Sequence, residues 1–303
     1  MENRKEFQQD TLIHGTAADG TVRCMAAVTT ELVAEAARRH DLWPTVAAAL
    51  GRTLTGTLLL GSSLKELDRL TVQIVGDGPI GGITAEANAR GQVRGYVRNP
   101  EAHAPYNEQG KFDVRAVVGQ GMFYVTRESG YDVGLYREPY RGSVPLVSGE
   151  IAEDFAYYLT KSEQIPSAVL LGVHLQPEAP YVSAAGGVMI QMMPGASERT
   201  VAAIEAAVSR MPQTTMMIRE GARPEDLLHA ALADLEFEVL DEKQVSFTCP
   251  CSYERAVSMI SSIDRAELES MLREDKGAVM TCHFCNETYR LDETELEKMM
   301  NAE

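Results

Sequence analysis

The pattern of hydrophobic and polar positions predicts strands and helices in alternation over the first part of the chain. An apolar run near Thr21–Thr29 predicts a strand, and helical patterns follow from about Glu31 to His40 and from Pro44 to about Gly61. Proline favours the first turn of a helix, where its missing N–H would have no partner. A third helix is predicted from Gly149 to about Gln164, with Ser148 as its N-cap.

Period-two alternation predicts the remaining strands of this part. They are LTVQIV from Leu70, ITAEAN from Ile83, VRGYV from Val93, a pair around FDVRAVV and GMFYVTRE, a strand from Ser167 to Leu175, and VMIQMM from Val188. The turn sequences GDGPIGG, ARGQ and VGQG favour antiparallel hairpins between them. This order of elements predicts an α+β fold with a mixed α/β core over residues 1–193, and not a repeating βα pattern.

From Pro194 onward the pattern changes to short, Ala-rich, acidic helices. They cover about Glu198–Arg210 and Pro224–Leu235, and a Met-rich stretch separates them. We interpret residues 194–235 as a helical linker. The methionines have two explanations, core packing or an adaptable binding face.

Residues 236–303 form a third, small module. The pattern predicts two short strands, helices near Tyr253–Ser262 and Arg265–Glu274, a hairpin and a final helix. A module of this size rarely has enough core to be stable alone, so a covalent or metal staple is expected.

Composition narrows the class of protein. The chain has 303 residues, 45% of them hydrophobic, and a net charge of −16, which argues against nucleic acid as a partner. The polar first fifteen residues lack a secretory signal, and no apolar run reaches the length that crosses a bilayer. We therefore expect a cytoplasmic protein with no membrane partner, whose five cysteines are reduced.

Four of those cysteines form two close pairs in the third module. Cys249 and Cys251 flank a proline, and Cys282 and Cys285 follow thirty residues later in a Cys-x-x-Cys pair. Two pairs separated by a loop are typical of a tetrahedral four-cysteine zinc site, which leaves no open position for catalysis. His283 is an alternative ligand.

The site has a purely structural interpretation, as in a zinc ribbon, and a regulatory one. The Cys-x-Cys spacing favours the second, because the two thiols of Cys249 and Cys251 are close enough to oxidise together. Zinc keeps cysteines as thiolates, the form that oxidants attack. Loss of the metal would remove the main stabilisation of the module.

Two other features have ordinary explanations. The GDGPIGG stretch from Gly76 matches a dinucleotide-binding pattern, but a strand-like pattern follows it instead of the required helix. Cys24 lies in an apolar strand and is interpreted as a buried core thiol.

The cysteine pairs, together with the stretches from Gly134 to Val173 and from Ala184 to Ala196, resemble the heat-shock protein 33 family of bacterial holdase chaperones. The resemblance covers essentially the whole chain. It implies a non-enzymatic, redox-regulated chaperone that binds one Zn²⁺ through Cys249, Cys251, Cys282 and Cys285 and is inactive in that reduced form.

Further properties are implied by the same resemblance. Oxidation would join Cys249 to Cys251 and Cys282 to Cys285, release the zinc, unfold module and linker, and produce homodimers. These would hold unfolding client proteins until ATP-dependent foldases take over. Two alternatives remain: an enzyme or adaptor with a structural zinc ribbon, and a zinc-ribbon module for nucleic acid, which the acidic charge disfavours.

Overall fold

The computed structural model describes residues 9–66, 68–107, 110–130, 138–178 and 181–301. They divide into two compact units, Met1–Thr248 and Cys249–Glu303. Residues 134–137, which begin one of the stretches that resemble the family, lie outside the described residues.

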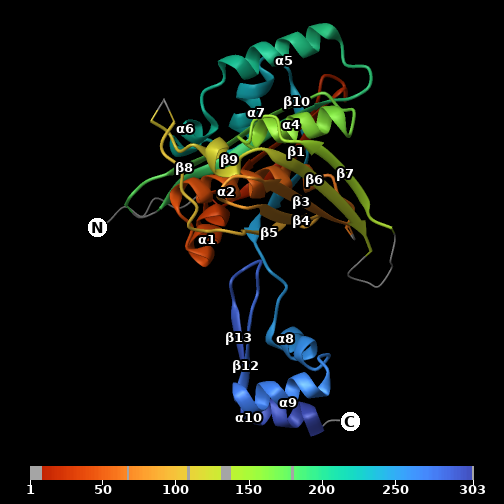
Figure 1. The fold of residues 1–303 in the computed structure, drawn as a ribbon. Coiled ribbons are helices and arrows are strands. Elements are labelled where there is room, and N and C mark those ends of the chain that lie inside the picture. The colour runs from red at the N-terminus through yellow and green to blue at the C-terminus, as the bar shows by residue number, and fades with distance from the viewer. Residues whose placement is uncertain (1–8, 67, 108–109, 131–137, 179–180, 302–303) are drawn as a thin grey trace, which may run out of the picture. The chain divides into compact units, whose positions relative to one another are not determined.

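The first unit contains two sheets (Figure 1). The five-stranded sheet has the order β10-β1-β2-β9-β8, and the six-stranded sheet has the order β11-β5-β4-β3-β6-β7. The strands are β1 Thr11–Ala17, β2 Val22–Val28, β3 Asp68–Gly76, β4 Ile83–Asn88, β5 Gln92–Val97, β6 Gly121–Ser129, β7 Tyr140–Pro145, β8 Ser167–Leu175, β9 Val182–Met192, β10 Phe237–Gln244 and β11 Ser246–Phe247. The GDGPIGG stretch connects the antiparallel strands β3 and β4, so the hairpin prediction is confirmed.

One long helix lies between the two sheets. Every residue of α2 except Pro44 and Arg52 is buried, because strands of both sheets pack against it. Its apolar side chains and those of the facing strands form one continuous core. The helices of this unit are α1 Thr30–His40, α2 Pro44–Gly61, α3 Val114–Val118, α4 Ala152–Lys161, α5 Glu198–Arg210, α6 Thr214–Arg219 and α7 Pro224–Leu232.

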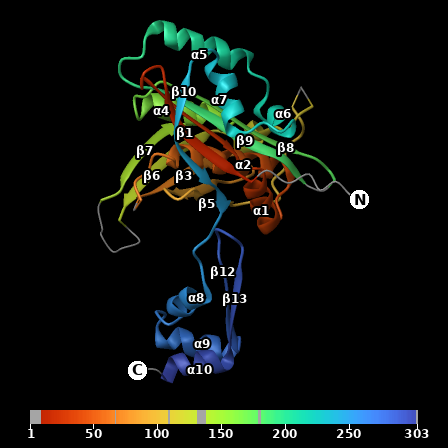
Figure 2. The ribbon, with the colours of Figure 1, turned by 180° about the vertical axis from the view of Figure 1, so that it is seen from behind.

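A second apolar cluster covers the other face of the five-stranded sheet. Side chains of α5 and α7, among them Ile204 and Leu228, pack there against Cys24, Val188 and Ile190 of β2 and β9. Figures 1 and 2 show α5 and α7 on the outer side of this sheet, away from α2. The predicted linker helices therefore form a layer of the first unit.

The two strands that were expected to open the third module pair elsewhere. β10 pairs antiparallel with β1, and β11 pairs parallel with β5. These residues therefore belong with the first unit, and the division of the structure lies at 248/249 rather than at 236. Neighbouring residues could not indicate this, because both partners lie more than 150 positions earlier in the chain.

One predicted strand is wrong. The FDVRAVV stretch forms helix α3, whose N-cap Asp113 accepts a hydrogen bond of 2.8 Å from the Ala116 N–H. Val114, Val117 and Val118 are buried on one helical face, and this spacing of three and four decides the structure over the strand preference of valine.

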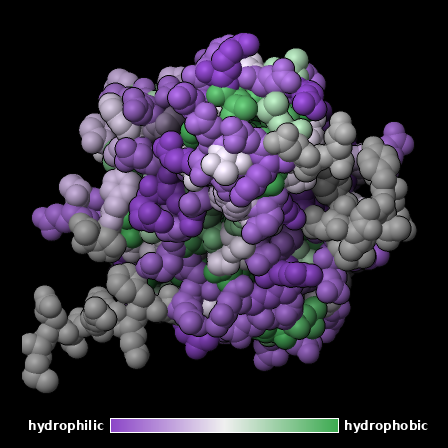
Figure 3. Space-filling view, turned by 90° about the horizontal axis from the view of Figure 1, so that it is seen from below, coloured by the Kyte–Doolittle hydropathy of each residue, from purple (hydrophilic) through white to green (hydrophobic). Residues whose placement is uncertain are grey.

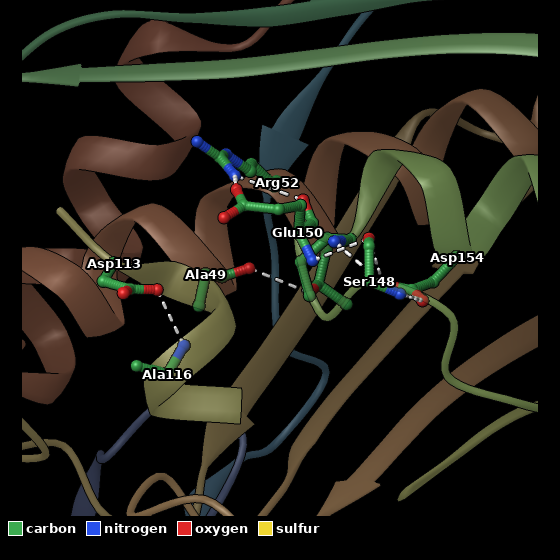
Figure 4. A network of polar contacts seen from close by, with 9 residues as sticks. Ala49, Arg52, Asp113, Ala116, Ser148, Glu150 and Asp154 are labelled. Atoms are coloured by element: carbon green, nitrogen blue, oxygen red, sulfur yellow. Dashed lines mark hydrogen bonds and ion pairs between the residues drawn. The ribbon is translucent and has the colours of Figure 1, made fainter. Parts of the chain in front are cut away.

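The helix expected from Gly149 begins three residues later, at Ala152. Ile151 has φ 74°, which is not helical, and the buried Asp154 carboxylate holds the loop by accepting N–H groups of Val147, Ser148 and Ile151 at 2.8–3.1 Å. Glu150 forms a 2.7 Å ion pair with Arg52 of α2. Figure 4 shows this network beside α3.

The second unit has its own small core. It contains α8 Tyr253–Ile260, α9 Arg265–Glu274, α10 Glu293–Asn301 and the hairpin of β12 Gly277–Thr281 and β13 Thr288–Asp292. One cluster of buried apolar residues forms this core: Ile260, Leu268, Ala278, Leu291 and Leu296. The predicted helices, hairpin and final helix of this module are confirmed.

The observed mixture of helices and mostly antiparallel sheets confirms the α+β class. The face drawn in Figure 3 is largely hydrophilic, with small separate apolar patches, as the net charge of −16 leads one to expect. Within the described residues, no helix combines the length and the apolar character that crossing a membrane requires.

Candidate metal centre

The two cysteine pairs lie in two connecting segments of the second unit. Cys249 and Cys251 lie just before α8, whose N-cap Ser252 accepts a hydrogen bond of 3.3 Å from the Arg255 N–H. Cys282 and Cys285 lie in the turn that joins β12 to β13.

That turn is a tight knuckle closed by backbone hydrogen bonds. The Asn286 N–H donates to the Cys282 carbonyl at 2.8 Å, and the Cys282 N–H donates to the Glu287 carbonyl at 2.9 Å. Asn286 takes φ 60°, a left-handed conformation that asparagine tolerates well. The knuckle therefore fixes the positions of Cys282 and Cys285 relative to each other.

The four sulfur atoms converge. All four lie within 4.8 Å of one another, with Sγ–Sγ distances of 3.7 Å between Cys249 and Cys282 and 3.2 Å between Cys251 and Cys285. Cys285 is 2% exposed, and the other three are half-buried. The structure thus brings together all four predicted residues.

The chemistry of this donor set fits a tetrahedral metal. In a site with metal–sulfur bonds of about 2.3 Å, the sulfurs lie about 3.8 Å apart, which is close to the distances observed. Four sulfur donors favour zinc over hard cations such as magnesium or calcium, which take oxygen ligands. These residues could therefore hold one metal ion of the zinc type.

The electrostatics of the site require a cation if the cysteines are to be thiolates. Burial raises the pKa of Cys282 and that of Cys285, because the charged form is desolvated. Without a metal these two thiols stay protonated at neutral pH. A bound metal ion reverses this, because ligand cysteines bind as thiolates.

Tyr289 of β13 also belongs to the site, although the sequence reasoning missed it. Its hydroxyl donates a 3.1 Å hydrogen bond to Cys251 Sγ, and this bond raises the pKa of the tyrosine. Donors to ligand atoms orient and tune metal sites. Only the register of the hairpin places this side chain, so no spacing rule points to it.

The other candidate residues lie apart from the centre. His283, the alternative ligand, is exposed and is not part of the ligand cluster among the described residues. Cys24 is fully buried in β2 of the first unit, as predicted, and desolvation raises its pKa to about 12.

Comparison with known proteins shows the family of this chain. The family model described as Hsp33 protein matches residues 10–292. The chain belongs to the Hsp33 family. The resemblance drawn from its cysteine pairs is therefore confirmed, and the family is one of chaperones.

Relatives of this Hsp33 family member match over nearly their whole length. It is 44% identical to the 33 kDa chaperonin of Desulforamulus reducens over 292 residues, 96% of this chain and 97% of the relative. It is also 44% identical to the 33 kDa chaperonin of Staphylococcus aureus strain JH9 over 294 residues, 97% of this chain and 98% of the relative.

A solved structure shows the same fold. The crystal structure of the 33 kDa chaperonin of Thermotoga maritima, a heat shock protein 33 homolog, superposes with a TM-score of 0.89 at 36% identity. The match covers 97% of this chain and 98% of that one. All three proteins carry the name of a chaperonin rather than of an enzyme.

Proposed function

We propose that this Hsp33 family member is a redox-regulated holdase with three functional parts: a core over residues 1–193, a helical linker over 194–235, and a redox-switch module that ends at residue 303. The observation that carries the proposal is the convergence of four thiols in a unit whose buried apolar cluster, among the described residues, is small. Such a unit depends on its cysteines, so chemistry at the thiols controls its folding.

The reduced state is held inactive by the four-cysteine centre. When bound, Zn²⁺ keeps the four cysteines as thiolates and contributes on the order of 10 kcal/mol to the folding of the module. Cys285 is the most buried of the four, so disruption of the centre also exposes this side chain to solvent.

Oxidation acts on each pair of thiolates separately. Cys249 and Cys251 give up two electrons to one molecule of hydrogen peroxide, which takes up two protons and leaves as two molecules of water, and one disulfide forms. Cys282 and Cys285 react in the same way with a second molecule of peroxide. The module then has neither thiolate ligands nor the metal that they held.

Loss of the module is coupled to release of the linker. Helices α5 and α7 have thirteen and nine residues, and isolated helices of that length are marginal in water. Their stability comes from packing, of α7 on the five-stranded sheet and of α5 on α7. Once they leave, the apolar sheet face around Val188 and Ile190 is open to unfolding client proteins.

The partners and setting follow from this cycle. The active form is a homodimer in the cytoplasm that binds unfolding proteins and passes them to ATP-dependent foldases, with no turnover and no nucleotide of its own. Neither nucleic acid nor membrane is a partner, which the acidic surface supports.

Light scattering from a thermally unfolding client tests the proposal. The protein is added either reduced and zinc-loaded or after oxidation by peroxide at elevated temperature. We expect that the oxidised form suppresses aggregation, that the reduced form does not, and that dithiothreitol with zinc reverses the effect. If neither form acts, the centre is structural and the holdase function is wrong.

A further inference from the structure

The five-stranded sheet ends in an edge that forms the wall of a cavity. β8 is the last strand of that sheet, and all nine of its residues are half-buried. A cavity of about 970 Å³ is lined by the seven consecutive residues Val169–Leu175. Successive side chains of a strand point to opposite faces of the sheet. Consecutive residues can therefore line the same cavity only when the edge of the strand faces that cavity.

Apolar side chains flank this edge. On the side of α6, Met211 and Met216 line the cavity, and Met216 is 53% exposed. Tyr106 and Phe112 also line it, with ring centroids 5.4 Å apart. A strand placed beside β8 would therefore find apolar side chains to contact.

Close packing at Gly172 sets the depth of the groove. A Cβ atom at this position would lie 2.6–2.7 Å from side-chain atoms of Thr214 and Thr215. The N-terminal turn of α6 thus lies directly over the strand. The strand is therefore partly covered by α6 at this position.

The charged residues of the groove are mostly basic, in a chain of net charge −16. Lys111 and Arg219 are exposed at its rim, and Glu153 is the exposed acidic residue there. Arg52 also lines the cavity but is paired with Glu150 at 2.7 Å. The local charge therefore favours an acidic occupant over a basic one.

We propose that this β8 groove, defined by β8, α6 and the side chains of Tyr106 and Phe112, binds an extended segment of an unfolded protein as an additional β-strand. The segment has alternating apolar side chains and acidic residues at its ends. Backbone hydrogen bonds to β8 supply affinity, and the flanking side chains supply preference. Seven residues at roughly 3.3 Å each give a contact about 23 Å long.

The nature of the occupant rests on the holdase function proposed above, but the groove is present while α5 and α7 are still docked. The outer face of the five-stranded sheet, by contrast, is covered as long as α5 and α7 stay docked. The reduced protein should therefore already bind extended peptides weakly, and release of the linker is not required.

Fluorescence anisotropy with the full-length, reduced, zinc-loaded protein tests this. The probe is a fluorescein-labelled peptide of alternating valine and threonine with two glutamates at each end. One comparison peptide has lysines in place of the glutamates, and another has N-methyl groups on alternate backbone nitrogens. We expect the glutamate peptide to bind best and the N-methylated peptide to lose most of its binding, since it cannot pair with β8.

The double variant Lys111→Glu/Arg219→Glu reverses the rim charge on exposed positions. It should weaken binding of the glutamate peptide by roughly fivefold and strengthen binding of the lysine peptide. The variant Arg90→Glu/Arg265→Glu changes net charge equally outside the groove and should change neither. Equal shifts in both double variants, or full binding of the N-methylated peptide, overturn the proposal.

Two further results separate this inference from the holdase function. Sedimentation of the reduced protein should show a monomer, and a dimer abolished by the groove variant would mean that a second copy occupies the edge, which also overturns the proposal. Aggregation assays are run on the same samples. If oxidation suppresses client aggregation but no peptide binds, the groove proposal is wrong and the holdase proposal stands. If peptide binds but aggregation is not suppressed in any state, the holdase proposal is wrong.

Discussion

Asp10 is a buried carboxylate that closes the N-terminus of α1. It is 6% exposed and accepts hydrogen bonds from the Glu31 N–H at 3.2 Å and the Leu32 N–H at 2.7 Å. Burial raises its pKa to about 7, against the lowering effect of these backbone donors. At neutral pH the folded protein therefore holds a carboxyl group whose charge is costly.

The pH dependence of stability should report this group. The pKa of Asp10 is about 7 in the folded state and about 4 in the unfolded state, so between these values the folded state binds more protons. Its contribution to the free energy of unfolding therefore falls as pH rises from about 4 to 7. Asp10→Asn keeps one of the two acceptor oxygens, cannot ionise and should remove this fall.

The free energy of unfolding at each pH is measured by denaturant titration. The fluorescence of the single tryptophan, Trp43 at the start of α2, reports unfolding. Relative to wild type, the variant should gain stability steadily across this window. Below about pH 4 the carboxyl is neutral in both states, which provides an internal reference. A constant difference between the two proteins from pH 4 to 7 would contradict the expectation.

Individual elements differ in how far the sequence predicts them. The bounds of α2, α5 and β8 agree with the expected ones, because each has a strong periodic pattern and clear turn or capping residues at its ends. The four cysteines of the centre were also predictable, since close spacing alone brings each pair together. Their arrangement across pairs, with Cys251 nearest to Cys285, required the fold.

The failures have a common cause in contacts between distant residues. β10 has an acidic, largely exposed sequence, and nothing within it indicates that β1 is its partner. α3 was mistaken for a strand because three of its five residues are valine, whereas their burial against other elements favours the helix. Tyr289 meets Cys251 only through the hairpin register. Local pattern thus predicts elements better than it predicts their partners.

The docking of α5 in the outer apolar cluster, where it packs against α7, can be tested with Cys24 as a reporter. Ile204 of α5 is 2% exposed and belongs to the same apolar cluster as Cys24, which is 0% exposed. Ile204→Ala should weaken this packing by about 2–4 kcal/mol. Alkylation of Cys24 by iodoacetamide in the reduced protein should then be faster, by roughly tenfold or more.

The matched control is Glu205→Ala, which introduces alanine at an exposed position of the same helix. Its rate of Cys24 alkylation, read by peptide mass spectrometry, should equal that of wild type. If Ile204→Ala also leaves the rate unchanged, α5 does not protect the thiol, and the layer formed by the linker helices is not what buries it.

At the scale of the whole molecule, one chain segment joins the linker to the metal centre. After α7 the chain forms β10 on the edge of one sheet and β11 on the edge of the other. Thr248 follows, and its N–H still donates to Val93 of β5 at 3.0 Å. The next residue along the chain is Cys249, the first cysteine of the candidate centre.

Removal of the metal alone should therefore unfold more than the second unit. The reduced protein is treated with a zinc chelator in the presence of dithiothreitol, so that no disulfide forms, and amide hydrogen exchange is followed by mass spectrometry. The hairpin of β12 and β13 should lose protection first. The small apolar core of the second unit cannot replace the free energy of metal binding, which is on the order of 10 kcal/mol. α2, buried between two sheets, should keep its protection.

The decisive regions are α5, α7 and β10. If loss of the centre frees β11 and then β10, α7 loses the strand that follows it, and the short linker helices exchange along with the hairpin. Addition of zinc should restore protection in all of them together. Helices α5 and α7 that stay protected while the hairpin exchanges would show that the linker is stable without the centre, which contradicts the proposed coupling between metal loss and linker release.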